Sequence, residues 1–176
     1  IGIFVWEDLD GDGIQDLGEP GIEDVNVTLT GSDVFGIPVS LTTTTDINGL
    51  YGFTNLTPGI YKLTFETPTG FTPTILNAGT DDALDSDADP LMGGMTNFEV
   101  LSSGETNLDY DAGYYQLASI GDFGWEDLNG NGIQETGEAG VEGVQVVITG
   151  FDNQGNFFTD VTFTDADGSY LFDNLV

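Results

Sequence analysis

The chain of 176 residues contains no cysteine, no histidine and no arginine, and Lys62 is its single basic residue. Without cysteine no disulfide can stabilise the fold, so a protein in harsh surroundings would need another kind of cross-link. Without histidine or cysteine, the Ser-His-Asp and Cys-His arrangements of nucleophilic catalysis are excluded. The acidic residues fall into metal-loop spacing and not into facing pairs, so we expect no enzyme activity.

Against the one lysine stand 31 acidic residues, which give a formal net charge of −30. This charge excludes nucleic acid and anionic membranes as partners, and no apolar run is long enough for direct membrane insertion. With 39% hydrophobic residues the chain can still form a packed core. Because self-repulsion opposes folding, the composition predicts bound cations or a salty medium, and hence an extracellular protein, secreted or attached to the cell surface.

The chain repeats itself. The stretch "IGIFVWEDLDGDGIQDLGEPGIEDVNVTLTG" at residue 1 returns at residue 120 as "IGDFGWEDLNGNGIQETGEAGVEGVQVVITG", and residues 46–56 return without a gap as 165–175. A tandem array of like domains explains this pattern. We expect a first domain at 1–117 and, at 118–176, the N-terminal part of a second, truncated copy, and we expect the chain to be an excerpt of a longer one.

Short alternating segments rich in β-branched and aromatic residues dominate each copy, bounded by Gly, Pro, Asn or Asp. In the first copy they are residues 1–6, 25–30, 39–45, 50–54, 60–66, 97–101 and 107–113. No stretch sustains a helical apolar period, so the pattern predicts an all-β sandwich of about seven strands. In the segment at 60–66, Tyr61, Leu63 and Phe65 should share the buried face.

The segment "DLDGDGIQDLGE", residues 8–19 and called the first loop below, has the spacing of an EF-hand calcium loop, although no helix is predicted beside it. Hard oxygen ligands in this number suit Ca²⁺ better than magnesium or zinc. The predicted ligands at positions 1, 3, 5, 7, 9 and 12 are Asp8, Asp10, Asp12, Ile14 through its carbonyl, Asp16 and Glu19.

An acidic chain also produces Asp-Gly turns by chance, and such turns are common between strands. Electrostatics weighs against chance here. Five carboxylates roughly 6 Å apart repel one another by about 7 kcal/mol in water before salt screening. This approaches the roughly 5–15 kcal/mol stability of a whole domain, so a bound cation is the better explanation.

The loop recurs at residues 127–138, called the second loop below, with an oxygen-bearing ligand at each position. Its predicted ligands are Asp127, Asn129, Asn131, Ile133, Glu135 and Glu138. Because only three of these are carboxylates, we expect weaker calcium affinity than in the first loop.

A second acidic cluster, "DDALDSDAD", occupies residues 81–89 and is called the acidic segment below. Either it is a solvated loop, or Asp85, Asp87 and Asp89, together with Asp111, form a further calcium site that holds a long loop against the sandwich. We favour the calcium site, although no fixed spacing defines one.

Together, "WEDLDGDGIQDLGEPGI", "TDINGLYGFTNLTPGIYKLTF", "DSDAD" and "DAGYY" resemble the B domains of serine-aspartate-repeat surface adhesins, the SdrD B-like family. These belong with collagen-adhesin B-type, prealbumin-like sandwiches of Ig-like architecture. The resemblance covers the first copy and what is present of the second. It implies calcium-stiffened stalk modules of secreted or surface-attached bacterial proteins, with an EF-hand-like loop set between strands.

The leading function hypothesis is therefore a calcium-stabilised structural repeat of an extracellular stalk, fibre or matrix protein, with neighbouring copies as partners. The alternative is an adhesive binding module, or a self-assembling homopolymer that pairs edge strands between subunits. Trp6 and Trp125 alternate with Phe4 and Phe123. This alternation favours core positions for the two tryptophans over a role in stacking against sugars. Surface glycans are a further candidate partner, because Asn26 and Asn55 each begin an Asn-x-Thr motif.

Overall fold

The structure is a computed structural model that describes residues 1–152 and 154–175. It confirms the all-β class: β-strands are the regular elements, and the helical element of the described residues is the 3-10 turn η1 (Pro90–Met92). No helix of the described chain is long and apolar enough to cross a membrane. The chain divides into two compact units, the first comprising Ile1–Gln116 and the second starting at Leu117.

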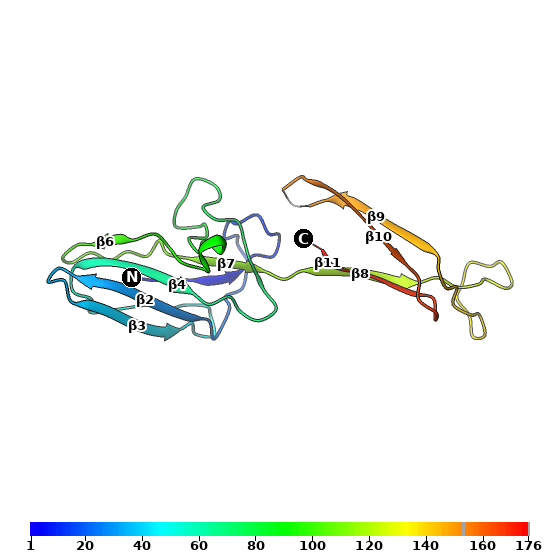
Figure 1. Cartoon of the computed structure of the whole chain (residues 1–176), viewed down its shortest axis with the longest axis horizontal. Coiled ribbons are helices and arrows are strands. Elements are labelled where there is room, and N and C mark those ends of the chain that lie inside the picture. The colour runs from blue at the N-terminus through cyan, green and yellow to red at the C-terminus, as the bar shows by residue number, and fades with distance from the viewer. Residues whose placement is uncertain (153, 176) are drawn as a thin grey trace. The chain divides into compact units, whose positions relative to one another are not determined.

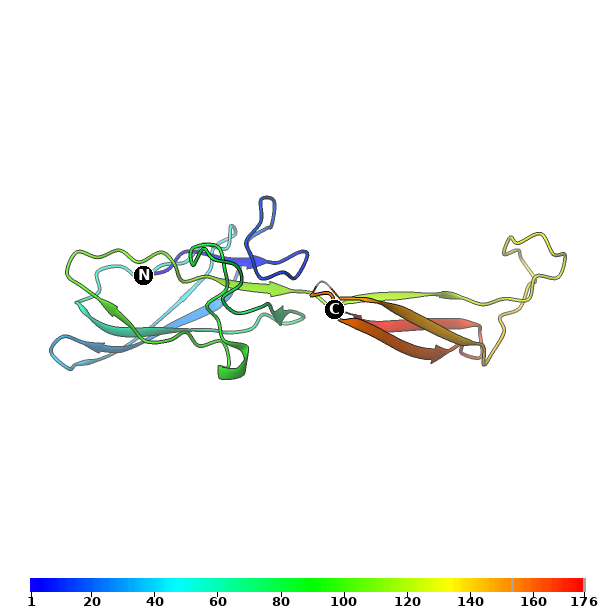
Figure 2. The ribbon, with the colours of Figure 1, turned by 90° about the horizontal axis from the view of Figure 1, so that it is seen from above.

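The first unit is a sandwich of two sheets, which Figures 1 and 2 show as separate layers. One sheet has the order β3-β2-β4-β6 and the other β1-β7-β5. The four-stranded sheet is antiparallel throughout, and β1 pairs with β7 in parallel. The strands are β1 (Val5–Glu7), β2 (Asn26–Asp33), β3 (Pro38–Thr44), β4 (Gly59–Phe65), β5 (Thr72–Pro73), β6 (Glu99–Leu101) and β7 (Ala112–Tyr115).

Alternation along β2 and β4 builds the core between the two sheets. Tyr61, Leu63 and Phe65 are each 1% exposed, as the period of the segment predicted. Leu63 lies opposite Leu29 of β2, which is fully buried, so the two leucines form one row of the core. The other sheet contributes fully buried Val5 and Tyr114 to this core. Trp6 is also fully buried, as its alternation with Phe4 indicated, but it lies outside the cluster between the sheets.

The second unit repeats the β2–β3 hairpin of the first unit, but its other strands differ from those of the first unit. Its strands are β8 (Ala118–Phe123), β9 (Gln145–Phe151), β10 (Phe157–Phe163) and β11 (Ser169–Leu175). β9 pairs with β10 as β2 pairs with β3, and β8 pairs with β11. In the first unit β2 has a second neighbour, β4, whereas β9 has β10 as its single neighbour among the described strands. This leaves Val147, Val161 and Phe163 about half exposed.

Two predicted strands differ from the structure. Residues 50–54 lack regular strand geometry and pair with the N-terminal segment through one bridge, Phe4 with Leu50, and main-chain hydrogen bonds. The segment predicted at 107–113 is displaced to Ala112–Tyr115, because Asp111 turns its carboxylate inwards to the Phe4 main chain. The short strand β5 was not predicted, since it contains Pro73, a residue depleted in strands.

Candidate metal centre

The first loop follows β1 directly, and Asp8 organises it. The carboxylate of Asp8 accepts hydrogen bonds from the main-chain N–H groups of Gly11 at 2.6 Å and Gly13 at 2.8 Å, and from the Thr74 hydroxyl. Its own N–H donates to the carbonyl of Tyr114 at 2.8 Å, which ties the start of the loop to β7. Asp8 is 1% exposed, so its charge is held within the fold by these donors.

Glu19 closes the loop. One carboxylate oxygen accepts from the N–H of Leu9 at 2.7 Å, and the other accepts from the N–H of Asp16 at 2.9 Å. Burial raises the pKa of Glu19, and the charges of Asp8 and Asp10 raise it further, against the lowering effect of the two N–H donors. The closing carboxylate therefore experiences the negative potential of the loop that it completes.

The carboxylates of the first loop converge in two overlapping groups. Oxygens of Asp8, Asp10 and Glu19 lie within 4.8 Å of one another, and so do oxygens of Asp10, Asp12 and Asp16. Two oxygens that each lie about 2.4 Å from a calcium ion can be at most about 4.8 Å apart. The five predicted side-chain ligands thus fit the spacing of a calcium shell, with Asp10 shared between the two groups.

The fold positions the first loop against the segment that leads to the acidic cluster. Gly13 has φ 82° and lies so close to this segment that an added Cβ would stand 2.8 Å from the Ile75 carbonyl oxygen. The next residue, Ile14, forms a bridge with Asp85, and Gln15 N–H donates to the Leu84 carbonyl at 2.7 Å. Glycine is required at position 13 both for its φ and for this contact. The bridge also connects the two acidic regions through the main chain.

The second loop repeats the hydrogen-bond pattern of the first at an offset of 119 residues. Asp127 accepts from the N–H groups of Gly130 and Gly132, at 2.6 and 2.7 Å, and Glu138 accepts from those of Leu128 and Glu135, at 3.0 and 2.9 Å. The N–H of Gly132, followed by those of Gly130 and Asn131, lowers the pKa of Asp127. The loop backbone is thus encoded locally, since it forms in both units.

The second loop differs in what surrounds Glu135. The side-chain amides of Asn129 and Asn131 donate to its two oxygens at 2.6 and 3.3 Å, whereas the first loop has Asp10 and Asp12 at the matching positions. No group of three carboxylates converges here as in the first loop, within the described residues. Ile133, the remaining predicted ligand, is 62% exposed. The second loop therefore supplies side-chain amide donors to one of its carboxylates, which the first loop, with Asp10 and Asp12 at these positions, cannot do.

Two aspartates of the acidic segment are linked to Asp111 from the start of β7. Burial raises the pKa of Asp111 to about 8 and that of Asp87 to about 7, and the charge of Asp87 adds to the shift at Asp111. Burial and the charges of Asp82 and Asp81 also raise the pKa of Asp85. Oδ1 of Asp85 and Oδ2 of Asp111 are buried without a hydrogen-bond partner in the described chain. Both are acceptors that a cation could satisfy.

The structure distributes the acidic segment differently from the sequence interpretation. Oxygens of Asp82, Asp85 and Asp87 converge within 4.8 Å, so Asp82 joins the group in place of Asp89. Asp89 caps η1, accepting from the N–H of Leu91 at 2.8 Å. Asp89 still lines a cavity of about 190 Å³ together with Asp82 and Asp87. The spacing of Asp82 three residues before Asp85 was visible in the sequence, but nothing there separated it from Asp81.

The two Asn-x-Thr motifs lie on the surface of the first unit. The Asn26 side chain donates to Glu66 at 2.8 Å, and Asn55 adopts a left-handed conformation with φ 59°. Both side chains are exposed, so a glycan on either stays a prediction.

A family model describes this chain twice. The model of the SdrD B-like domain matches residues 1–114 and again residues 118–176. Serine-aspartate repeat-containing protein F of Staphylococcus epidermidis is 44% identical over 99% of the chain, which covers 10% of that relative. Serine-aspartate repeat-containing protein C of Staphylococcus aureus is 42% identical over 99% of the chain, covering 17% of it. The chain thus spans less than a fifth of the length of these relatives.

Two solved structures align over most of the chain. The Bacillus anthracis TIE protein aligns with a TM-score of 0.42 and 16% identity over 98% of this chain and 26% of its own. Shaft pilin SpaA from Lactobacillus rhamnosus GG aligns with a TM-score of 0.32 and 10% identity, over 99% of this chain and 82% of its own.

The first unit is a β-sandwich with acidic loops between its strands, and the second unit repeats one hairpin and one acidic loop of the first. The chain belongs to the SdrD B-like domain family, as the family model and the two staphylococcal relatives show. It is therefore an extracellular or cell-surface module.

Proposed function

We propose that the chain is a calcium-stabilised structural repeat of an extracellular stalk, fibre or matrix protein. The observation that carries this proposal is the pair of buried carboxylate oxygens, Asp85 Oδ1 and Asp111 Oδ2, that lack any hydrogen-bond partner in the described chain. A buried carboxylate without a partner is costly, and the chain has one basic residue with which to pair thirty-one acids. A bound cation would compensate these carboxylates in their ionised form.

The donor set favours calcium. Every predicted ligand of the two acidic regions offers oxygen, and the chain contains no cysteine or histidine to favour zinc. Magnesium demands near-ideal octahedral geometry and keeps several waters, whereas calcium accepts six to eight oxygens in irregular arrangements. Two overlapping carboxylate triads in one loop supply many oxygens without octahedral regularity. Calcium would neutralise their mutual repulsion.

Calcium at these positions would stiffen the first unit. Asp8 is tied to Thr74 and Tyr114, and Ile14 is bridged to Asp85, so each acidic region is already connected to several segments of the sandwich. Ions bound there would link segments distant in the sequence, the task that disulfides perform in cysteine-containing extracellular domains. The proposed product is a rigid repeat that is loosened when calcium is removed.

Differential scanning calorimetry of the full chain tests this proposal. With calcium at about 100 times its Kd, the transition of the first unit should rise by about 10 °C over the value in chelator, since binding adds about 2.7 kcal/mol. Magnesium at the same concentration should give a smaller shift. Chelator should also accelerate limited proteolysis within residues 74–89. A transition indifferent to calcium, with proteolysis unchanged by chelator, would falsify the proposal.

Self-association is a second candidate function, favoured by the free edge of β3. This strand (Pro38–Thr44) is the outer strand of its sheet and carries no charged residue, and its one proline is confined to its first position. Natural sheets usually protect such edges with charges, bulges or prolines, so an uncharged edge is suited to pairing with another chain. Negative-stain electron microscopy separates the two candidates, because a stalk module stays a single string of domains whereas an assembling subunit forms polymers. Replacing Thr42 with Lys should suppress polymers if β3 is the contact.

A further inference from the structure

Three asparagine-glycine dipeptides occur in the chain, at residues 48–49, 129–130 and 131–132. Each aligns, at the offset of 119 residues, with an aspartate-glycine dipeptide of the other repeat, at 167–168, 10–11 and 12–13. The fold therefore accepts aspartate at every position where one copy has such an asparagine. Loss of the side-chain amide there gives a residue that the other copy already carries.

An asparagine that precedes glycine can lose its side-chain amide without an enzyme. The main-chain nitrogen of the glycine attacks the side-chain carbonyl carbon and a C–N bond forms. The Cγ–Nδ2 bond then breaks, and ammonia leaves with the proton of the attacking nitrogen. Water opens the cyclic imide at one of its two carbonyls, which gives aspartate or isoaspartate. Glycine favours the attack because it has no Cβ to hinder the approach.

Packing holds the dipeptide at 48–49 in place. Gly49 is buried, and a Cβ added to it would clash with the Val5 carbonyl oxygen and stand 2.6 Å from Gly21 Cα. Its N–H donates to the Asp46 carbonyl at 2.8 Å. Ring closure has to rotate the peptide between Asn48 and Gly49, and these contacts oppose the rotation. Asn48 is therefore protected, although its side chain is exposed.

The side-chain amides of the second loop are oriented for attack. The oxygen of Asn129 accepts from the Asn131 N–H at 3.0 Å, and that of Asn131 accepts from the Ile133 N–H at 2.6 Å. Each bond spans the glycine in between, so the side-chain carbonyl is folded back toward the main chain that follows it. The two amide nitrogens, which have to leave, point to Glu135 instead.

Both asparagines are exposed to the water that the second step consumes. The first unit, where both sheets surround the loop, has the same exposure at the matching positions, since Asp10 is exposed and Asp12 partly exposed. The same side-chain bonds also recur there, from the Asp12 N–H to Asp10 at 3.3 Å and from the Ile14 N–H to Asp12 at 2.8 Å. The geometry in the second loop thus follows from the loop itself.

We infer that Asn129 and Asn131 are sites of spontaneous deamidation, whereas Asn48 is protected. Deamidation to aspartate raises the number of carboxylates among the predicted ligands of the second loop from three to five, the number in the first loop. The reaction itself is independent of calcium. Its consequence for affinity rests on the proposed function, because added carboxylates tighten the loop only if it binds calcium.

The product decides how the second loop responds. Aspartate at position 129 removes the amide that donates to Glu135 at 2.6 Å and adds a like charge, so the calcium-free loop is destabilised while the calcium-bound loop gains a ligand. Isoaspartate lengthens the main chain by one methylene group and moves the later ligands out of register. Bound calcium slows the reaction, because the asparagine oxygens must leave the ion before the ring can close. Deamidation therefore accumulates during the time that the loop spends without calcium.

Peptide mapping of the full chain by mass spectrometry tests the inference. The chain is incubated in chelator at physiological temperature, and the deamidated fraction at each asparagine is followed with time. Electron-transfer fragmentation separates aspartate from isoaspartate. Asn129 and Asn131 should deamidate faster than Asn48 by about tenfold or more, because Gly49 must first leave its packing contacts.

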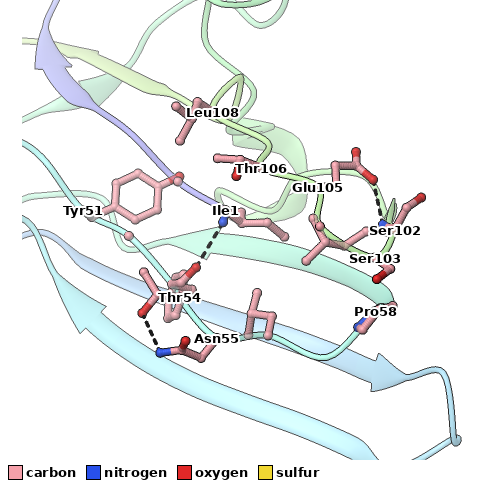
Figure 3. A pocket seen from close by; sticks show the side chains of 16 residues that line it. Ile1, Tyr51, Thr54, Asn55, Pro58, Ser102, Ser103, Glu105, Thr106 and Leu108 are labelled. Atoms are coloured by element: carbon pink, nitrogen blue, oxygen red, sulfur yellow. Dashed lines mark hydrogen bonds between the residues drawn. The ribbon is translucent and has the colours of Figure 1, made fainter.

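Two controls separate exposure from the requirement for glycine. Asn55 is exposed and lines the cavity of about 540 Å³ in Figure 3, but Leu56 follows it, so it should keep its amide. The variant Asn129→Gln retains an amide at the end of a longer side chain, which must close a larger ring. The reaction at position 129 should disappear in this variant while the reaction at Asn131 continues.

A second loop that keeps both amides in chelator, or that reacts no faster than Asn48, overturns the inference. A product that consists of isoaspartate alone also overturns it, since no ligand is then gained. Calcium at about 100 times its Kd should slow the reaction by about tenfold or more, because the ion-free loop is then a minor species. Deamidation that occurs in chelator and is unchanged by calcium would leave the inference standing and count against calcium binding at the second loop.

Discussion

Asp87 and Asp111 are joined by two hydrogen bonds inside the first unit. The N–H of Asp111 donates to Oδ2 of Asp87 at 2.9 Å, and the N–H of Asp87 donates to the main-chain carbonyl of Asp111 at the same distance. The backbone thus fixes two acids side by side in a place where burial raises both pKa values, to about 7 and about 8. Such a pair binds either protons or a cation.

This pair predicts how the stability of the calcium-free protein depends on pH. In the folded state both pKa values lie above the unfolded value near 4. The contribution of the pair to stability is therefore complete below about pH 4, where the carboxyls are protonated in both states. That contribution is lost as the pH rises from about 4 through about 8. The denaturation midpoint of the first unit in chelator should therefore fall over this window. The shift produced by calcium should grow over the same window, because calcium needs the deprotonated form.

The matched variant for this prediction is Asp111→Asn, which keeps an oxygen to accept from the Phe4 N–H at 3.0 Å but cannot ionise. In chelator at pH 8 the variant should be more stable than the parent, and its response to calcium should be smaller. Both are measured by urea denaturation. A variant that is less stable than the parent in chelator at pH 8 would show that the Asp111 charge is already compensated without a metal.

Replacing Glu19 with Gln should weaken calcium binding to the first loop by about tenfold or more, because Glu19 closes the loop and belongs to the triad with Asp8 and Asp10. Isothermal titration calorimetry gives the affinity. The control is Glu23→Gln, an exposed position outside the loop with the same change of charge. Equal weakening by both variants would assign the effect to net charge and not to ligation.

Replacing Asn131 with Asp should tighten calcium binding to the second loop, because the change adds a carboxylate. Asn131 Oδ1 accepts from the Ile133 N–H at 2.6 Å, and an aspartate oxygen can accept the same hydrogen bond. The same change should destabilise the calcium-free loop, since Glu135 loses an amide donor and gains a like charge. Affinity is measured by calorimetric titration, and Asn48→Asp, in an exposed turn, controls for the added charge. Unchanged affinity in Asn131→Asp would mean that this position does not contact the ion.

Replacing Leu29 with Ala should cost the first unit about 2–5 kcal/mol, because Leu29 is fully buried against Leu63 and its removal leaves a cavity. Leu41 faces Leu29 from β3 but is 43% exposed, so Leu41→Ala is the matched control and should cost much less. Urea denaturation at one calcium concentration measures both. If the two variants lose similar amounts of unfolding free energy, Leu29 does not contribute more to the core than the exposed Leu41.

Much of the fold was predictable because its determinants are local. The alternation of Tyr61, Leu63 and Phe65 defines the buried face of β4 whatever the strand pairs with. The loop spacing behaves in the same way. Asp8 and Asp127 make equivalent bonds to loop N–H groups in units whose surroundings differ, so the loop backbone follows from residues within the loop.

The amino-acid sequence by itself thus determined the class of the fold, the repeat and the position of the acidic loops, because periodicity and turn chemistry act over a few residues. Tertiary structure decided what contacts between distant segments control. It buries Asp8 beneath Thr74 while Asp127 stays partly exposed, and it selects Asp82 over Asp89 for the carboxylate group.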